Sequence, residues 1–139
     1  MPSSASTAAP AAWADNAKVV VYKSPTCGCC TKWMDHLEEN DIDVESRDVR
    51  DVSPIKRANG VPPGMTACHT ALAGGYFIEG HVPAEDVKRL LKERPEIAGL
   101  TVPGMPIGSP GMEGPHPERY RVFAVGRDGK LSTFATHGP

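Results

Sequence analysis

Three of the four cysteines in the chain fall within four positions, at Cys27, Cys29 and Cys30. A cysteine thiolate attacks disulfides and binds soft metal ions, and it forms more readily beside the positive end of a helix dipole. The residue types and their spacing therefore predict either thiol–disulfide chemistry or metal binding. The fourth cysteine, Cys68, is distant in sequence, so only the fold can bring it to the other three.

The cysteines lie between an apolar run and an amphipathic run. Residues 18–22 (KVVVY) are short and β-branched, which predicts a buried strand. After the cysteines, Trp33 and Leu37 follow Cys30 at helical spacing on one face, and Asn40 is a suitable helix end. We therefore expect the cysteines at a helix N-terminus, where unpaired backbone N–H groups favour a thiolate.

The rest of the first hundred residues alternates between strand and helix signals. The expected elements are a strand over 43–49, a helix from Ser53 that Gly60 stops, a hairpin of 66–73 and 76–79 turning on Gly74-Gly75, and a helix from Pro83 that ends before Pro95. With the first strand and helix, the order is β-α-β-α-β-β-α.

Residues 99–117 contain five glycines and five prolines, so we expect neither a helix nor a central strand there. A long loop inside a compact domain usually has a function. This loop carries Met105 and Met112 on a backbone stiffened by proline. Two strands are expected after it, over 120–126 and 131–136, as a hairpin that turns on Asp128-Gly129.

Composition excludes several classes of protein. A length of 139 residues suits one domain, here residues 18–139, and the Ala-, Ser- and Pro-rich residues 1–17 are expected to be a disordered tail or linker. The net charge of -2 and the pI near 6.2 give no electrostatic reason to expect a nucleic-acid partner. No apolar run approaches the roughly twenty residues of a membrane-spanning helix, so we expect no membrane insertion.

The element order, with a Cys-x-x-Cys pair where the first strand meets the first helix, resembles the thioredoxin fold. The predicted fold class is α/β, a central mixed sheet flanked by helices, with the Gly/Pro-rich loop and a C-terminal hairpin added. In such folds the loop before the third strand lies against the cysteine pair, which would bring Met65 and Cys68 towards Cys27 and Cys30. The fourth strand would return His81 to the same edge.

The candidate ligands share soft or borderline donor atoms. They are Cys27, Cys29, Cys30, Cys68, His81, Met105 and Met112. Thiolates together with thioethers favour Cu(I) over Mg²⁺ or Ca²⁺, and zinc almost never takes methionine. Copper is therefore the predicted metal.

Competing interpretations of these residues stay open. Cys27 and Cys30 can form a structural or redox disulfide, Cys68 can be an ordinary buried thiol, and the loop methionines can be packing residues. His69 is a second choice because on a strand it would face away from Cys68.

Three segments resemble a bacterial family of thioredoxin-like metal-binding proteins that includes the CopG-type copper-resistance proteins. The segments are SPTCGCCTKWMDHLEEN, VPPGMTACHTALAGGYFIEGHVPAEDVKRLL and PGMPIGSPGMEG. The resemblance covers about residues 18–136. It implies a periplasmic or envelope-facing protein, often encoded with copper-export genes. It also implies copper held by Cys27, Cys29 and Cys30 with further Cys, His or Met ligands, including as a multinuclear Cu(I) cluster that cycles its redox state.

The first functional hypothesis is a copper-binding protein of copper resistance and homeostasis that interconverts Cu(I) and Cu(II), with copper-export or copper-resistance proteins as partners. The alternative is a metal-free thiol–disulfide oxidoreductase that uses Cys27 and Cys30. A third hypothesis is a passive module stabilised by zinc.

Overall fold

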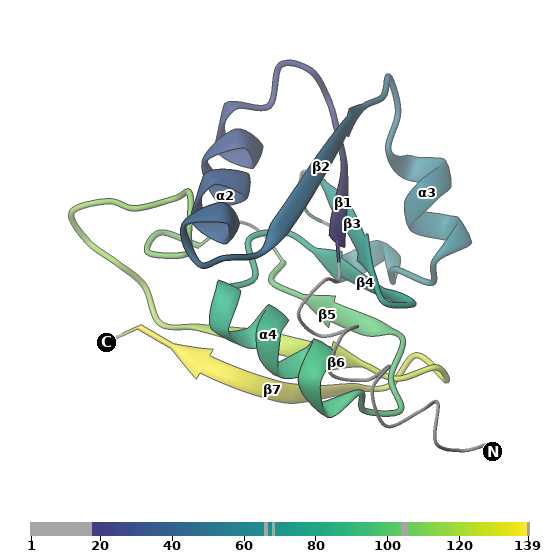
Figure 1. Cartoon of the computed structure of the whole chain (residues 1–139). Helices are drawn as coiled ribbons and strands as arrows, with labels where there is room; N and C mark the ends of the chain where they lie inside the picture. Colours follow the sequence, from purple (N-terminus) through teal and green to yellow (C-terminus); the bar gives the residue numbers. More distant parts are fainter. Residues whose placement is uncertain (1–17, 66, 68, 104–105, 139) are drawn as a thin grey trace, which may run out of the picture.

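The computed structural model describes residues 18–65, 67, 69–103 and 106–138, and a seven-stranded mixed sheet runs through them (Figure 1). The strand order is β2-β1-β3-β4-β5-β6-β7. The strands are β1 (Lys18–Lys23), β2 (Asp43–Asp48), β3 (Thr70–Ala73), β4 (Tyr76–Glu79), β5 (Gly99–Thr101), β6 (Tyr120–Val125) and β7 (Leu131–His137). The pairs β1–β2 and β4–β5 are parallel and the other neighbours antiparallel. The predicted α/β class is confirmed.

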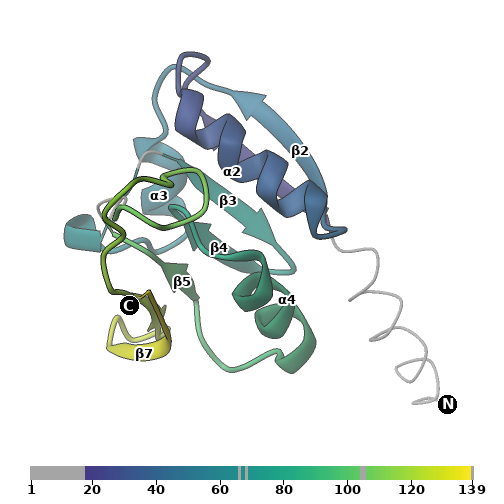
Figure 2. The same cartoon turned by 90° about the vertical axis from the view of Figure 1, so that its left-hand side faces the viewer.

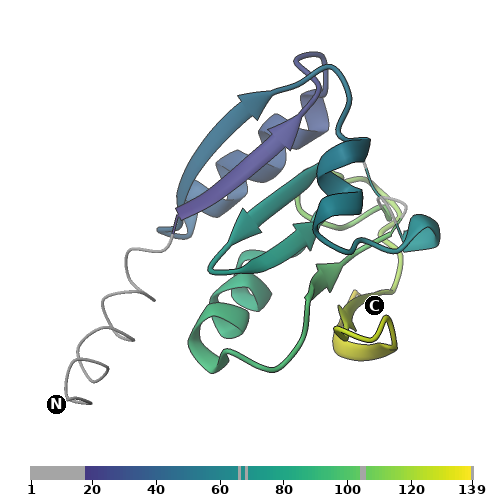
Figure 3. The ribbon, with the colours of Figure 1, turned by 90° about the vertical axis from the view of Figure 1, so that its right-hand side faces the viewer.

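Helices cover the two faces of the sheet unequally. They are α2 (Gly28–Glu39), α3 (Ser53–Ala58) and α4 (Ala84–Glu93), with a 3₁₀ turn, η1 (Pro63–Met65). Figure 2 looks onto α2 and α4, and Figure 3 shows the opposite face with α3 in front of the sheet. None of the described helices is long and apolar enough to cross a bilayer.

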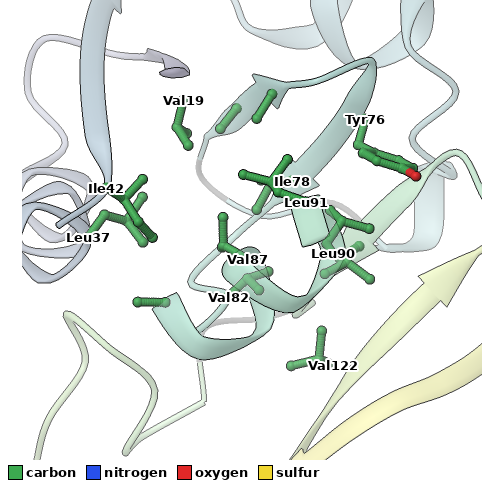
Figure 4. Packing of buried hydrophobic residues seen from close by; sticks show 14 of the residues in the cluster. Val19, Leu37, Ile42, Tyr76, Ile78, Val82, Val87, Leu90, Leu91 and Val122 are labelled. Carbon is green, nitrogen blue, oxygen red and sulfur yellow. The ribbon is translucent and has the colours of Figure 1, made fainter. Parts of the chain in front are cut away.

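The main hydrophobic core lies between the sheet and the α2/α4 layer (Figure 4). Alternate residues of β1, β3 and β4 point into it because successive side chains of a strand face opposite sides. Leu37 of α2 and Leu90 of α4 meet Val19 and Ile78 of the sheet there, and all four have no exposed surface.

The α3 face holds a much smaller apolar cluster. It consists of Val61, Phe77 and Val125, and no residue of α3 itself is buried. Beside this cluster, the charged side chains of Lys56 and Glu79 meet below the loop that precedes β3.

Two expectations about strands were wrong. Strand β3 begins at Thr70, later than the predicted start, because the backbone at Ala67 hydrogen-bonds to a buried side chain instead of to a neighbouring strand. A short strand, β5, does form at the start of the Gly/Pro-rich segment, where it pairs with β4 and β6. Gly99 permits this close approach, since a Cβ there would lie 2.3 Å from the carbonyl oxygen of Phe77. The predicted tail, residues 1–17, lies outside the described residues.

Candidate metal centre

The cysteine cluster lies at the connection between β1 and α2. Cys27 is the N-cap residue of α2, with extended backbone, and its N–H donates to the carbonyl of Ser24 over 3.1 Å. Cys29 and Cys30 occupy the first turn of the helix. The sulfur atoms of the three cysteines lie within 4.8 Å of one another, close enough to share a metal ion. The helix dipole at this end favours their thiolate forms.

The structure shows this cluster in an oxidised state. Cys27 and Cys30 form a disulfide with their Cα atoms 5.4 Å apart. The half-buried Cys29 is a thiol, and its sulfur lies 3.6 Å from that of Cys27. Because metals bind thiolates, the two bonded cysteines become ligands only after reduction.

His69 contacts the cluster directly, contrary to its second-choice ranking. Its Nδ1 lies 3.3 Å from the sulfur of Cys30, and its Nε2 lies 3.0 Å from the carbonyl oxygen of Gly80. A carbonyl only accepts, so Nε2 carries the proton and Nδ1 presents a lone pair to Cys30. His69 was expected to face away from Cys68 because both were placed on a strand, but residue 69 precedes β3, so strand alternation does not apply to it.

The His69 ring is fully buried between two other rings. Its centroid is 4.5 Å from that of Trp33 and 5.3 Å from that of His81, and both pairs are stacked. Burial lowers the pKa of His69 to about 3, and the neighbouring His81 adds to the effect. The imidazole is therefore neutral at physiological pH, which is the form that binds metals.

His81 lies at the cysteine end of the sheet, where the topological argument placed it. It follows Gly80, whose positive φ of 79° turns the chain at the end of β4. Its side chain has no exposed surface, and burial lowers the pKa of His81 although a hydrogen bond to the Pro110 backbone opposes the shift.

The Gly/Pro-rich loop packs onto the same end. A Cβ on Gly111 would lie 3.0 Å from the carbonyl oxygen of Cys29 and 3.1 Å from the ring of His81. Next to it, Met112 donates its N–H to Ser109 and accepts at its carbonyl from Gly108, both over 2.8 Å. Figures 1 and 2 show the loop, in green, between α2 and the β6–β7 hairpin. The fold therefore brings the backbone that carries Met112 to the cysteines.

Two predicted ligands, Cys68 and Met105, lie outside the described residues, so their role stays a prediction. Met65 ends η1, and its carbonyl accepts from the hydroxyl of Thr101 over 2.7 Å. Among the other histidines, His36 has a structural contact that sequence reasoning missed, since its Nε2 accepts from the N–H of Ala84 at the start of α4 over 3.0 Å.

The sheet, its helices and the sulfur-rich end define an α/β protein with a candidate soft-metal site. Two solved structures, described as "Copper resistance protein copG- Form 1" and "Form 2", each match with a TM-score of 0.83 and 42% sequence identity, over 88% of this chain and 98% of the other. At this identity and coverage, the chain belongs to the family of the copper resistance protein CopG.

A family model described as "Protein of unknown function, DUF411" also matches residues 65–112. No curated protein matches the chain. The family resemblance predicted from three sequence segments is thus confirmed.

Proposed function

We propose that the protein is a copper-binding protein of copper resistance and homeostasis that binds Cu(I). The observation that carries the proposal is the group of three cysteine sulfurs within 4.8 Å at the start of α2. Thiolate and thioether ligands select Cu(I), and a neutral imidazole also binds copper. The copper-resistance name of the similar solved structures supports this choice of metal.

The proposed ligands come from several segments of the chain. They are Cys27, Cys29, Cys30, Cys68, His81, Met105 and Met112, with His69 as an addition from the structure. Several thiolates at one point can bridge ions, so we propose a multinuclear Cu(I) cluster as the loaded form. When bound, copper supplies a centre that exchanges one electron between Cu(I) and Cu(II).

The protein itself contributes three things to this chemistry. When an external dithiol reduces the Cys27–Cys30 disulfide and is itself oxidised, the site gains two thiolates in addition to that of Cys29. The neutral, buried histidines place no positive charge beside the incoming cation. The loop at Gly111 packs against the Cys29 backbone and the His81 ring on one side of the site.

Location and partners follow from the family resemblance alone. We propose a periplasmic protein that exchanges copper with copper-export or copper-resistance proteins. Cell fractionation followed by cross-linking during copper stress tests both statements, and recovery of the full-length protein only from the cytoplasm would contradict the first.

An anaerobic copper titration of the reduced protein tests the central proposal. We expect thiolate-to-Cu(I) absorption that saturates at a fixed stoichiometry, and loss of that binding in Cys27→Ser and Cys30→Ser. Met34→Leu is the matched control, because this thioether packs against the main core. Unaltered copper uptake by the two serine variants would overturn the proposal.

The Cys27–Cys30 disulfide at a helix N-terminus favours a second candidate, a metal-free thiol–disulfide oxidoreductase. Reduction of insulin by the metal-free protein, abolished by Cys27→Ser, would support it. The zinc-stabilised module predicts a melting temperature that a chelator lowers, so a chelator-independent melting curve would exclude that module.

A further inference from the structure

A buried ion pair lies behind the cysteine site, on the α3 face of the sheet. Glu79, at the end of β4, has no exposed side-chain surface, and the side chain of Lys56 from α3 is only 13% exposed. Removing two charges from water costs more than their attraction returns unless further hydrogen bonds satisfy them. The partners of this pair therefore indicate what it does.

Apart from each other, the two side chains bond to one short segment, residues 67–70. The carboxylate of Glu79 accepts from the N–H of Ala67 over 2.7 Å and from the hydroxyl of Thr70 over 2.6 Å. The ammonium group of Lys56 donates to the Ala67 carbonyl and to the Thr70 hydroxyl, each over 3.0 Å. The pair thus fixes the chain on both sides of His69, through the backbone of Ala67 and the hydroxyl of Thr70.

The His69 ring itself is hydrogen-bonded to a residue at the same end of β4. Gly80, the residue after Glu79, accepts from the Nε2–H of the imidazole. With the backbone held by the ion pair and the ring held by Gly80, the lone pair of Nδ1 stays directed at the sulfur of Cys30. Without the ion pair, Thr70 keeps its pairing in the sheet with Tyr22 and Glu79, whereas Ala67 loses its hydrogen bonds to Lys56 and Glu79.

We propose that Lys56 and Glu79 are positioning residues for the cysteine site: they hold the 67–70 segment so that His69 covers Cys30 and shields its sulfur. The consequence for copper rests on the proposed function, whereas the positioning of His69 does not. Neither residue contacts a cysteine sulfur through any described hydrogen bond, so their effect passes through His69.

The first test replaces both charges together in the reduced, metal-free protein. Lys56→Met/Glu79→Leu leaves no buried charge unpaired, so it is expected to fold. It removes the side-chain hydrogen bonds to Ala67 and Thr70. We therefore expect Cys30 to react with iodoacetamide about tenfold faster, as measured by tandem mass spectrometry. We also expect the ring ¹⁵N chemical shifts of His69 to change from those of one fixed tautomer to the average of the two tautomers. Asp86→Asn, at a carboxyl 4% exposed on α4, is the matched control and should change neither readout.

A second pair of variants removes a single link and serves even if the double variant fails to fold. Thr70→Val deletes the hydroxyl that joins Lys56 to Glu79, and Thr70→Ser keeps it. We expect Thr70→Val to speed Cys30 alkylation about threefold and Thr70→Ser to restore the original rate. A folded Thr70→Val protein with an unchanged alkylation rate and unchanged His69 signals would overturn the proposal.

Copper titration of the same variants separates the two proposals. If the unmodified protein binds no copper but the thiol and histidine readouts change as stated, the proposed function fails and the positioning role stands. If copper binds and the readouts do not change, the positioning role fails alone.

Discussion

The two faces of the sheet are built by different physical means. On the α2/α4 face, side chains such as Leu37, Ile78 and Leu90 have no exposed surface and bury a continuous apolar core. On the α3 face the apolar cluster is small, and the buried Lys56–Glu79 pair ties the loop before β3 to the sheet. Apolar contact is non-directional and gives stability, whereas hydrogen-bonded charges give one geometry at a cost in desolvation.

The cysteine site lies at one end of the sheet, where residues from both layers come together. Cys30 and Trp33 approach it from α2, on the apolar face, and His69 approaches it from the segment that the ion pair holds. The comparison indicates a division of labour, in which the α2/α4 face holds the fold together and the α3 face sets the geometry around one sulfur. The following changes test that division, beginning with the largest expected effect.

Lys56→Met should be the most destabilising of these changes. It leaves the carboxylate of Glu79 buried without its cation, which costs about 3–5 kcal/mol of unfolding free energy. Urea denaturation followed by circular dichroism measures the loss. Lys56→Met/Glu79→Leu should recover most of it, and an equal loss in the single and double variants would show that the ion pair has no specific role.

Leu90→Ala should destabilise the fold and leave the site alone. Leu90 is fully buried in the main core (Figure 4), and its truncation removes about 3 kcal/mol of unfolding free energy through lost transfer energy and a cavity. Copper stoichiometry below the melting temperature should be unchanged, and Leu90→Met is the volume-conserving control. A changed stoichiometry would break the division of labour between the faces.

Stability of the disulfide-bonded, metal-free protein should fall on mild acidification. The folded state lowers the pKa of His69 from 6.5 to about 3 by burial, so between these values the unfolded chain binds more protons. The stabilisation is complete above pH 6.5 and is lost as the pH falls, by about 1.4 kcal/mol between pH 7.5 and 5.5 for this residue alone. His81, whose pKa is also lowered, acts in the same direction.

Urea midpoints at the two pH values measure this dependence. His69→Gln should reduce it, and His116→Ala, at an exposed position, should not. An equal pH dependence in all three proteins would contradict the assignment to His69.

Local patterns predicted the apolar face and its part of the site. The helical spacing of Cys30, Trp33 and Leu37 gave α2 and its buried side, and hairpin topology placed His81 at the cysteine end. The first prediction depends on periodicity within one helix and the second on the turn between two adjacent strands, and a sequence shows both directly.

The polar face was not predictable in this way. His69 was misjudged because β3 starts one residue after it, and strand alternation cannot be applied outside a strand. The Lys56–Glu79 pair joins two elements 23 residues apart with no local signal in either one. The sequence also did not show which glycine of the loop lies at the site, because the contact of Gly111 with Cys29 appears only in the folded structure.

Gly111→Ala should have the smallest effect on stability and the most selective effect on the site. The backbone φ of 92° costs a residue with a Cβ about 1 kcal/mol, and the new methyl group would press on the Cys29 carbonyl and the His81 ring. Gly129→Ala is matched to it, since its φ is 89° and nothing lies within 4 Å of the added Cβ. Both variants should lose unfolding free energy to the strained backbone, Gly111→Ala somewhat more because of its close contacts. Only Gly111→Ala should move the loop from the cysteines and release Cu(I) faster to a competing chelator. Equal release rates would mean that the loop touches the site without covering it, so that access to copper is governed by α2 and the 67–70 segment.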